Sequence, residues 1–244
     1  MSGSPSGAGG GWAAVDRRLA ELAARYGLEP TAVAALRTML EVLADDEHAA
    51  TTVRSPIEAV DRHVADGLSG LEVAAVREAE RLVDIGTGIG VPALVLAAAR
   101  PSLEVVAMDT VGKKVDWVTA CAARMGLANV EGVHGRAEAW PAGLERFDVV
   151  AARAVAPLGV LVEYAAPLLR VGGRLVAWKG VVDPEEDRVG AAVAGQLAMG
   201  EPESAPTRPW PAARDRRFVT VEKQGPTPRG FPRKPGMARK RPLG

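Results

Sequence analysis

The stretch Leu82-Val-Asp-Ile-Gly-Thr-Gly-Ile-Gly90 decides the fold of this chain. It predicts a buried strand that ends in Asp84, then a Gly-x-Gly-x-Gly turn that begins at Gly86, and then a helix that follows Pro92. Glycines let the backbone turn sharply and approach a ligand that any Cβ would obstruct. Because ligands of α/β sheets bind outside the carboxyl ends of the strands, this stretch indicates a ligand-binding turn.

Strands and helices alternate on the C-terminal side of the turn. Strands nearly continuous in Val, Ile and Ala, with helices between them, predict a parallel sheet covered on both faces. The expected strands are residues 81–85, 103–109, 130–135, 147–152, 174–178 and 217–223. The expected helices are residues 91–99, 113–125, 158–169 and 185–199, and residues 201–213 are expected to form a loop.

The residues before the turn have a helical pattern. Apolar residues recur at helical spacing between Trp12 and Tyr26 and again from Pro30 to Leu43, and a further helix is expected over residues 57–71. The Gly- and Ser-rich start is expected to be disordered. The sequence thus predicts a disordered tail over 1–11, a helical N-terminal cap over 12–80, an α/β domain over 81–225 and a basic tail over 226–244.

Composition narrows the class of protein. Hydrophobic residues make up 48% and charged residues 25% of the 244 residues, as is typical of a globular protein with a sizeable core. The single cysteine, Cys121, excludes an internal disulfide framework and a cysteine-rich zinc site. No segment has the run of about 20 apolar residues that a membrane span needs. We therefore expect a cytoplasmic protein without a membrane partner, and no metal site, because the three histidines lie far apart in the chain.

The formal net charge of zero hides an asymmetry between two parts of the chain. Residues 1–206 carry 19 basic and 28 acidic side chains, which gives −9, whereas residues 207–244 carry 11 and 2, which gives +9. The basic side chains counted toward the tail are Lys223, Arg229, Arg233, Lys234, Arg239, Lys240 and Arg241. Such side chains bind phosphates in a salt-dependent way without reading sequence.

Two functions are open for this basic segment: contact with RNA or a solubilising disordered end. We favour RNA because the rest of the chain is acidic and would repel it. Prolines and Gly236 are expected to keep the tail extended along a groove. Removing residues 226–244 is then expected to weaken RNA binding and to spare cofactor affinity.

The turn also narrows the choice of cofactor. Asp109 ends the second expected strand, and a carboxylate there can accept hydrogen bonds from both hydroxyls of a ribose. Nucleotide folds that hold a pyrophosphate use Gly-x-Gly-x-x-Gly, but here Val91 stands at the third glycine position. S-adenosylmethionine carries no pyrophosphate and fits the open turn better. A nicotinamide cofactor and a purely structural turn remain the alternatives.

Several motifs together resemble one family. The run from Asp84 to Pro92, the segment Asp109-Thr-Val-Gly-Lys-Lys114, the pair Arg153-Ala154 and the proline-rich basic ending are similar to the bacterial 16S ribosomal RNA guanine-N7 methyltransferases, also called glucose-inhibited division protein B. The resemblance covers roughly residues 57–244. It implies a class I S-adenosylmethionine-dependent methyltransferase fold, an α/β structure with a mostly parallel seven-stranded sheet. It also implies a cytoplasmic enzyme, expected to be monomeric, that methylates one guanine of the small-subunit RNA.

The resemblance assigns site residues by position. Gly86 and Val91 would line the methionine side of the cofactor, together with Gly88 of the glycine turn. Ala137 and Glu138 would flank the adenine, and Arg153 would close the site. An ion pair or a helix cap is the alternative for Arg153, and a solvated strand-end charge is the alternative for Glu138. The assignment of Asp109 does not come from the resemblance; it rests only on the hydrogen bonds that a carboxylate there can accept from the ribose hydroxyls.

The chemistry needs no general base, because guanine N7 carries an in-plane lone pair and no hydrogen. We expect catalysis by proximity and orientation and assign no catalytic residue. Residues 43–52 lack the asparagines and the aromatic residue usual in the family, so substrate contact there is expected to differ. The rivals are a methyltransferase of small molecules, a nicotinamide-dependent oxidoreductase, and a non-catalytic ribosome-binding relative that keeps the cofactor fold.

Overall fold

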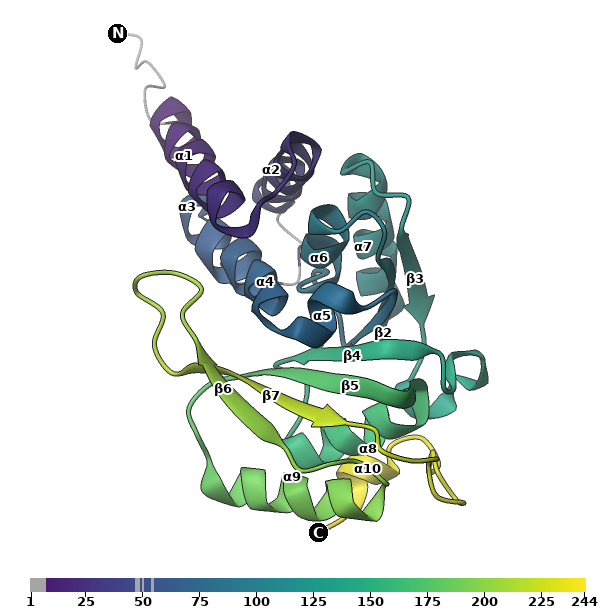
Figure 1. Ribbon diagram of the computed structural model, residues 1–244. Helices are drawn as coiled ribbons and strands as arrows, with labels where there is room; N and C mark the ends of the chain where they lie inside the picture. Colours follow the sequence, from purple (N-terminus) through teal and green to yellow (C-terminus); the bar gives the residue numbers. More distant parts are fainter. Residues whose placement is uncertain (1–7, 47–48, 50, 54) are drawn as a thin grey trace, which may run out of the picture.

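The computed structural model describes residues 8–46, 49, 51–53 and 55–244 (Figure 1). A seven-stranded sheet runs through it in the order β3-β2-β1-β4-β5-β7-β6. The strands are β1 Arg81–Ile85, β2 Glu104–Asp109, β3 Val130–His134, β4 Phe147–Arg153, β5 Leu169–Lys179, β6 Glu203–Thr207 and β7 Arg216–Glu222. The pairs from β3 to β5 are parallel, and β7 is antiparallel to both of its neighbours. The mostly parallel seven-stranded sheet implied by the family resemblance is therefore confirmed.

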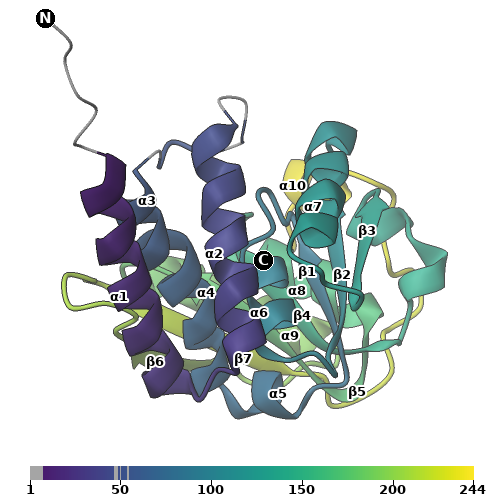
Figure 2. The same cartoon turned by 90° about the horizontal axis from the view of Figure 1, so that it is seen from above.

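The N-terminal helices and the first two helices of the α/β part cover one face of the sheet (Figure 2). They are α1 Ala8–Tyr26, α2 Pro30–Asp45, α3 Pro56–Ala59, η1 Val60–Ala65, α4 Asp66–Leu68, η2 Ser69–Glu72, α5 Ala74–Glu78, α6 Ala93–Ala99 and α7 Gly112–Arg124. Alternate residues of a strand point to opposite faces, so Leu82 packs under these helices while Val83 packs on the other side. The core thus lies in two layers, one on each face of the sheet.

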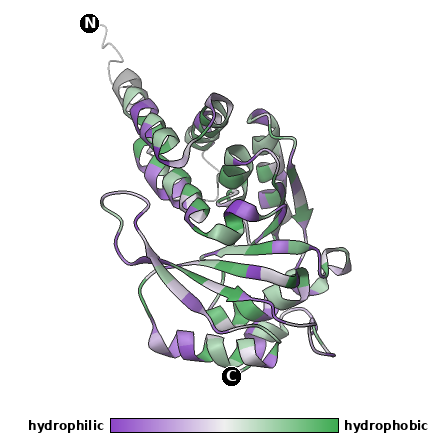
Figure 3. Ribbon diagram, viewed as in Figure 1, coloured by the Kyte–Doolittle hydropathy of each residue, from purple (hydrophilic) through white to green (hydrophobic). Residues whose placement is uncertain are grey.

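The other face is covered by α8 Leu158–Leu168, α9 Pro184–Gln196 and the short α10 Met237–Lys240, with the turns η3 Ala137–Ala139 and η4 Pro141–Gly143 beside them. Every residue of α8 is buried. In contrast, the first turn of α9 carries three acidic residues that face solvent or neighbouring basic side chains. The carboxylate of Asp183 caps α9 by accepting from the backbone of Glu185 and Glu186. Figure 3 shows mostly hydrophobic residues in the central strands and more hydrophilic ones along the outer helices α1 and α9.

The expected loop over residues 201–213 was wrong in its first half, because β6 lies there. Residues 203–206 are all exposed, so neither face of the strand needs apolar residues. The sequence therefore lacks the alternation of apolar and polar residues that predicts a strand. Pro206 is tolerated because β6 is the edge of the sheet and pairs only with β7. The strand forms because β7 offers it hydrogen-bond partners, and no pattern within residues 203–207 indicates this pairing.

Two further expectations need correction. Helix α1 begins at Ala8, so the last residues of the segment expected to be disordered are helical, while residues 1–7 lie outside the described part. Strand β5 begins at Leu169 and not at Arg174, directly after α8. Within the described residues no helix is long and apolar enough to cross a membrane.

Candidate cofactor site

A cleft of about 410 Å³ opens at the carboxyl ends of β1 to β4. Its volume lies in the range of small-molecule sites, and its position is the one where α/β sheets bind ligands. The residues that line it are Ile85, Gly86, Met108, Asp109, Thr110, Lys114, Gly135, Arg136, Ala137, Glu138, Ala154, Val155, Tyr164 and Arg239. Four of the predicted site residues, Gly86, Asp109, Ala137 and Glu138, are among them.

A larger cavity of about 670 Å³ lies at the opposite edge of the sheet. Asp148 and Arg170, which form an ion pair near the starts of β4 and β5, line it. The amino ends of parallel strands are not where ligands of this fold class bind. The cleft at the carboxyl ends is therefore the candidate site.

Gly86 forms the turn at the mouth of β1. Its φ is +71°, a left-handed conformation that favours glycine. A Cβ at this position would lie 2.8 Å from Cγ2 of Val155, which lines the same cleft after β4. A side chain here would thus close the gap between the ends of β1 and β4, so the absence of one keeps the cradle open for a ligand.

Asp109 holds the glycine turn in place. Its Oδ2 accepts from the backbone N–H of Gly88 at 3.1 Å, and its Oδ1 accepts from that of Val111 at 3.0 Å. The ammonium of Lys114 lies 3.7 Å from Oδ2. A carboxylate has about four acceptor positions, so two backbone donors leave capacity for two further hydroxyl donors.

The far wall of the cleft combines an apolar floor with polar groups. Ala137 is buried, and Glu138 beside it accepts from the backbone N–H of Gly236 at 2.8 Å. Tyr164 comes from the buried helix α8, and burial together with the nearby Glu138 raises the pKa of its phenol. The phenol therefore stays neutral and can donate a hydrogen bond near neutral pH.

Asp84 lies beneath the turn and does not line the cleft. It is 1% exposed, and its Oδ2 accepts from the backbone N–H of Ala93, the first residue of α6, at 3.3 Å. Burial raises the pKa of this carboxyl to about 7. The carboxylate ties the end of β1 to the start of α6, so its role is to shape the turn.

The structure does not bring the other three predicted residues to the cleft wall. Val91 is 3% exposed within the core under the N-terminal helices. Gly88 takes part only through its N–H, which holds Asp109. Arg153 donates to Oδ2 of Asp66 at 2.8 Å and to the carbonyl of Arg62 at 3.2 Å, so it joins β4 to the N-terminal helices.

The C-terminal segment is folded against the body of the protein, contrary to the expected extended tail. Arg233 makes two hydrogen bonds, of 2.7 and 2.6 Å, to the carboxylate of Glu163, which is 4% exposed on α8. Arg239 donates to the carbonyl of Val155 at 2.8 Å and lines the cofactor cleft. The segment is thus a wall of the site as well as a source of charge.

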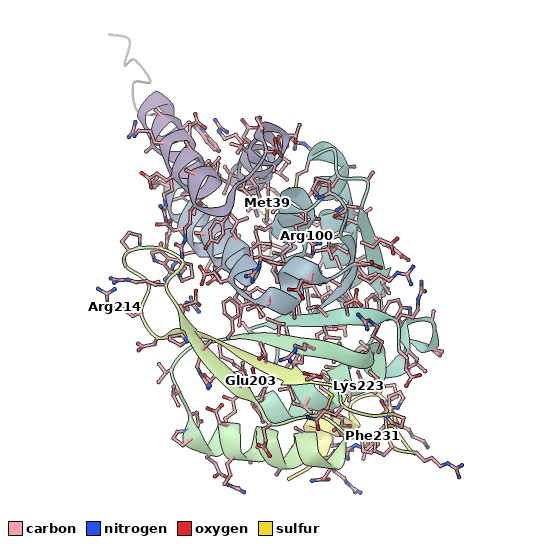
Figure 4. The ribbon with its side chains drawn as sticks, viewed as in Figure 1. Met39, Arg100, Glu203, Arg214, Lys223 and Phe231 are labelled. Carbon is pink, nitrogen blue, oxygen red and sulfur yellow. The ribbon has the colours of Figure 1, made fainter. Side chains whose placement is uncertain are left out.

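Lys223, which Figure 4 labels, was counted with the basic tail, but it is fully buried. Its ammonium donates to the carbonyl of Leu169 at 2.7 Å and lies 3.4 Å from Oε1 of Glu145. Its ammonium is therefore not accessible to RNA, contrary to the expectation from sequence. Arg229, Lys234, Lys240 and Arg241 remain exposed.

Sequence reasoning missed Lys114, Tyr164 and Arg239 as wall residues of the cleft. Lys114 belongs to the quoted motif that follows Asp109, so a signal for it was present in the sequence. Tyr164 lies inside an apolar helix, and Arg239 lies far along the chain. Only the tertiary structure brings the latter two to the cleft.

His63 is a structural residue and not a surface contact. It is 5% exposed, and its Nε2 lies 3.1 Å from Oγ1 of Thr51. Burial, reinforced by the charge of Arg153, lowers the pKa of its imidazole to about 4. His48, the other histidine of this region, lies outside the described residues. Among the described residues no three His, Cys, Asp or Glu side chains are placed to hold a metal ion.

The buried imidazole predicts a loss of stability in acid. The pKa is lower in the folded state, so the contribution of neutral His63 is complete above pH 6.5 and is lost as the pH falls toward 4. At pH 5 the loss amounts to about 2 kcal/mol in the free energy of unfolding. Urea denaturation of the wild type and of His63→Gln at pH 7 and pH 5 measures it as the difference between the two proteins. His134→Gln, which alters an exposed ring, is the control, and equal losses in wild type and His63→Gln would contradict the assignment.

Comparison with known proteins identifies relatives of this chain. A family model described as rRNA small subunit methyltransferase G (GidB) matches residues 34–200. The ribosomal RNA small subunit methyltransferase G of Deinococcus radiodurans is 39% identical over 196 residues, which are 79% of this chain and 78% of that protein. The protein of the same name from Rubrobacter xylanophilus is 37% identical over 259 aligned positions, with 100% of this chain and 98% of that protein covered.

Solved structures show the same fold at low sequence identity. An S-adenosylmethionine-dependent O-methyltransferase from Thermotoga maritima superposes with a TM-score of 0.54 at 18% identity, covering 67% of this chain and 66% of that one. The fibrillarin pre-rRNA processing protein of Methanococcus jannaschii gives a TM-score of 0.51 at 17% identity, covering 66% and 74%. The fold is that of the class I S-adenosylmethionine-dependent methyltransferases. With the family model and the curated relatives spanning most of its length, the chain belongs to the rRNA small subunit methyltransferase G family.

Proposed function

We propose that this chain transfers the methyl group of S-adenosylmethionine to N7 of a guanine in 16S ribosomal RNA, with the cofactor held in the cleft at the carboxyl ends of β1 to β4. Methylation of small-subunit ribosomal RNA follows from the family to which the chain belongs. The single observation that carries the site is the glycine turn at Gly86, which opens onto this cleft and has no room for a Cβ.

In this proposal each wall of the cleft contacts a different part of the cofactor. Gly86 lies where the amino-acid moiety would pass close to the backbone. Asp109 would accept from the ribose hydroxyls with its remaining lone pairs. Ala137 and Glu138 would flank the adenine, while Tyr164 adds a neutral phenol on the same side.

Gly88, Val91 and Arg153 act through other groups in this proposal. The N–H of Gly88 positions Asp109, and Val91 packs the turn against the core. Arg153 fixes the end of β4 to Asp66 of the N-terminal helices. The bound cofactor supplies an electrophilic methyl group, and the protein needs to hold the guanine ring so that N7 faces it, since no proton must be removed.

RNA binding would use the exposed basic side chains of the C-terminal segment. Arg229, Lys234, Lys240 and Arg241 are exposed, whereas Arg233 is held by Glu163. Phosphates that contact these side chains would release counterions, which makes the affinity salt-dependent. The proposal places the protein in the cytoplasm with the ribosomal subunits, and as a monomer.

The test is transfer of a labelled methyl group to small ribosomal subunits that lack the modification. We expect the label in the RNA, in a single 7-methylguanosine after digestion to nucleosides, when the wild type is incubated with labelled S-adenosylmethionine. Asp109→Asn is the control with an altered ribose contact and is expected to transfer label more slowly. Label on another atom of the RNA, on ribosomal protein, or on nucleosides that were not part of the RNA before digestion would contradict the proposal.

A further inference from the structure

The loop between β6 and β7, residues 208–215, forms a basic cleft that the cofactor site does not use. The cleft has a volume of about 720 Å³, and four of its lining residues are Arg208, Arg214, Arg216 and Arg217. Arg217 is held by two hydrogen bonds of 2.9 Å to Asp187 and is 5% exposed. The other three arginines, with Asp215 as the one acid among residues 208–216, leave a net positive charge on the loop.

Two of these arginines converge on one backbone oxygen. Arg208 donates to the carbonyl of Pro211 at 2.7 Å, and Arg214 donates to the same carbonyl at 3.1 Å. Both side chains are exposed, and no carboxylate of the described residues forms an ion pair with either. Two guanidinium groups held this close repel each other unless an anion lies between or beside them. Their planar donor forks match phosphate oxygens.

The register of the sheet places this loop at the same edge as the cofactor cleft. Thr207 at the end of β6 pairs with Arg216, and Lys179 at the end of β5 pairs with Arg217. One strand further, Trp178 pairs with Arg153 at the end of β4. Figure 4 shows Arg214 on this loop at the periphery of the molecule.

Asp66 joins Arg216, at the start of β7 after this loop, to Arg153 at the end of β4. Its Oδ1 lies 3.9 Å from Nε of Arg216, and its Oδ2 accepts from Arg153 at 2.8 Å. Asp66 itself is 1% exposed. The residues that follow Arg153, Ala154 and Val155, line the cofactor cleft. The loop is thus connected, through Arg216 and one buried carboxylate, to the strand end that precedes the cleft wall at Ala154 and Val155.

Apolar side chains lie in and beside this cleft. Val181 and Val182, which follow β5, are 73% and 60% exposed. Val182 lines the cleft, and the guanidinium of Arg216 lies 5.6 Å above the half-buried ring of Trp210. Nucleic-acid sites combine cations for the backbone with apolar or aromatic surface for the bases.

From these observations we infer that the loop between β6 and β7 together with Arg216 of β7 (residues 208–216, the arginine loop) binds the sugar-phosphate backbone of the ribosomal RNA next to the nucleotide that is methylated. The inference rests on the proposed function and adds a docking surface to it. Arg208 and Arg214 contact phosphates, while Val181 and Val182 pack against an adjacent base or ribose. The rest of the chain up to residue 206 carries a net charge of −9, so the loop and the C-terminal segment are the parts that attract RNA.

The test compares three double variants. Arg208→Ala/Arg214→Ala removes the two guanidinium groups, and Arg208→Lys/Arg214→Lys keeps the charges. Arg81→Ala/Arg124→Ala removes two charges at the amino ends of the strands, where Arg124 is exposed and Arg81 pairs with exposed Glu104, and is the matched control. Thermal melting verifies that all three are folded, and calorimetry measures their affinity for S-adenosylmethionine.

Binding to purified 16S RNA and to unmodified small subunits is then measured at several salt concentrations. For the alanine variant we expect affinity for RNA to fall roughly tenfold or more at about 0.1 M salt. The slope of log K against log salt should become shallower by about 1.5, since each lost phosphate contact accounts for about 0.7 to 0.9. The KM for subunits rises, while cofactor affinity stays at the wild-type value. The lysine variant keeps most of the slope.

The outcomes separate the two proposals. A salt slope equal to that of the Arg81→Ala/Arg124→Ala control would overturn the arginine-loop inference. Weaker binding to assembled subunits only, with an unchanged salt slope on purified RNA, would also overturn it and would indicate a ribosomal protein as the contact. A wild type that binds cofactor but methylates no subunit would refute the proposed function alone, because the RNA slopes still measure the loop.

Discussion

The Gly86→Ala variant is expected to bind S-adenosylmethionine roughly tenfold to 100-fold more weakly than the wild type while remaining folded. The new Cβ would lie 2.8 Å from Cγ2 of Val155, so Gly86 or Val155, both of which line the cleft, must shift. A tenfold to 100-fold loss corresponds to about 1.4–2.8 kcal/mol of binding free energy, as expected if the shifted wall occupies space that the cofactor needs. Calorimetric titration of the purified variant measures the effect directly.

Gly126 provides the control for backbone strain. Its φ is +73°, close to the +71° of Gly86, but a Cβ there would meet no atom within 4 Å. Gly126→Ala should therefore share the strain of about 1–2 kcal/mol in stability and leave cofactor affinity unchanged. Wild-type affinity in Gly86→Ala would show that the turn does not face the cofactor.

Removal of residues 226–244 is expected to lower the free energy of unfolding by about 3–5 kcal/mol, because the Arg233–Glu163 ion pair and the apolar contacts of Phe231, Ala238 and Leu243 with the core are lost together. Cofactor affinity should fall as well, by about tenfold, since Arg239 leaves the cleft wall and Glu138 loses the N–H of Gly236. This reverses the expectation from sequence that the truncation spares the cofactor. Urea denaturation and calorimetry measure the two effects separately.

A pair of substitutions isolates the buried ion pair from the other contacts of the segment. Arg233→Leu leaves the carboxylate of Glu163 unpaired and should account for much of the lost stability. Adding Glu163→Gln removes the buried charge and should restore part of it. If Arg233→Leu melted like the wild type, the ion pair would not hold the segment, and the loss on truncation would have to come from the packing of residues such as Phe231 and Leu243.

The sequence by itself determined the fold class, because its signals are local. The periodicity of the apolar strands and the helices between them predicts a parallel sheet, and the glycine turn after Asp84 marks its ligand-binding edge. The expected strand over residues 81–85 agrees with β1. Asp109 could be placed at the cleft because the carboxyl ends of neighbouring parallel strands lie at one edge. The edge strand β6 was missed since exposure on both faces removes its pattern.

Only the tertiary structure decided which charged side chains face solvent and which are buried or paired with other groups of the protein. Lys223, Arg233 and Arg239 look alike in sequence, yet one is fully buried, one pairs with Glu163 and one lines the cofactor cleft. The same holds for Arg153, whose guanidinium turns to Asp66 of the N-terminal helices. The physical reason is that a charge pairs with whatever the fold brings near it, and these partners lie 54 to 87 positions away in the chain.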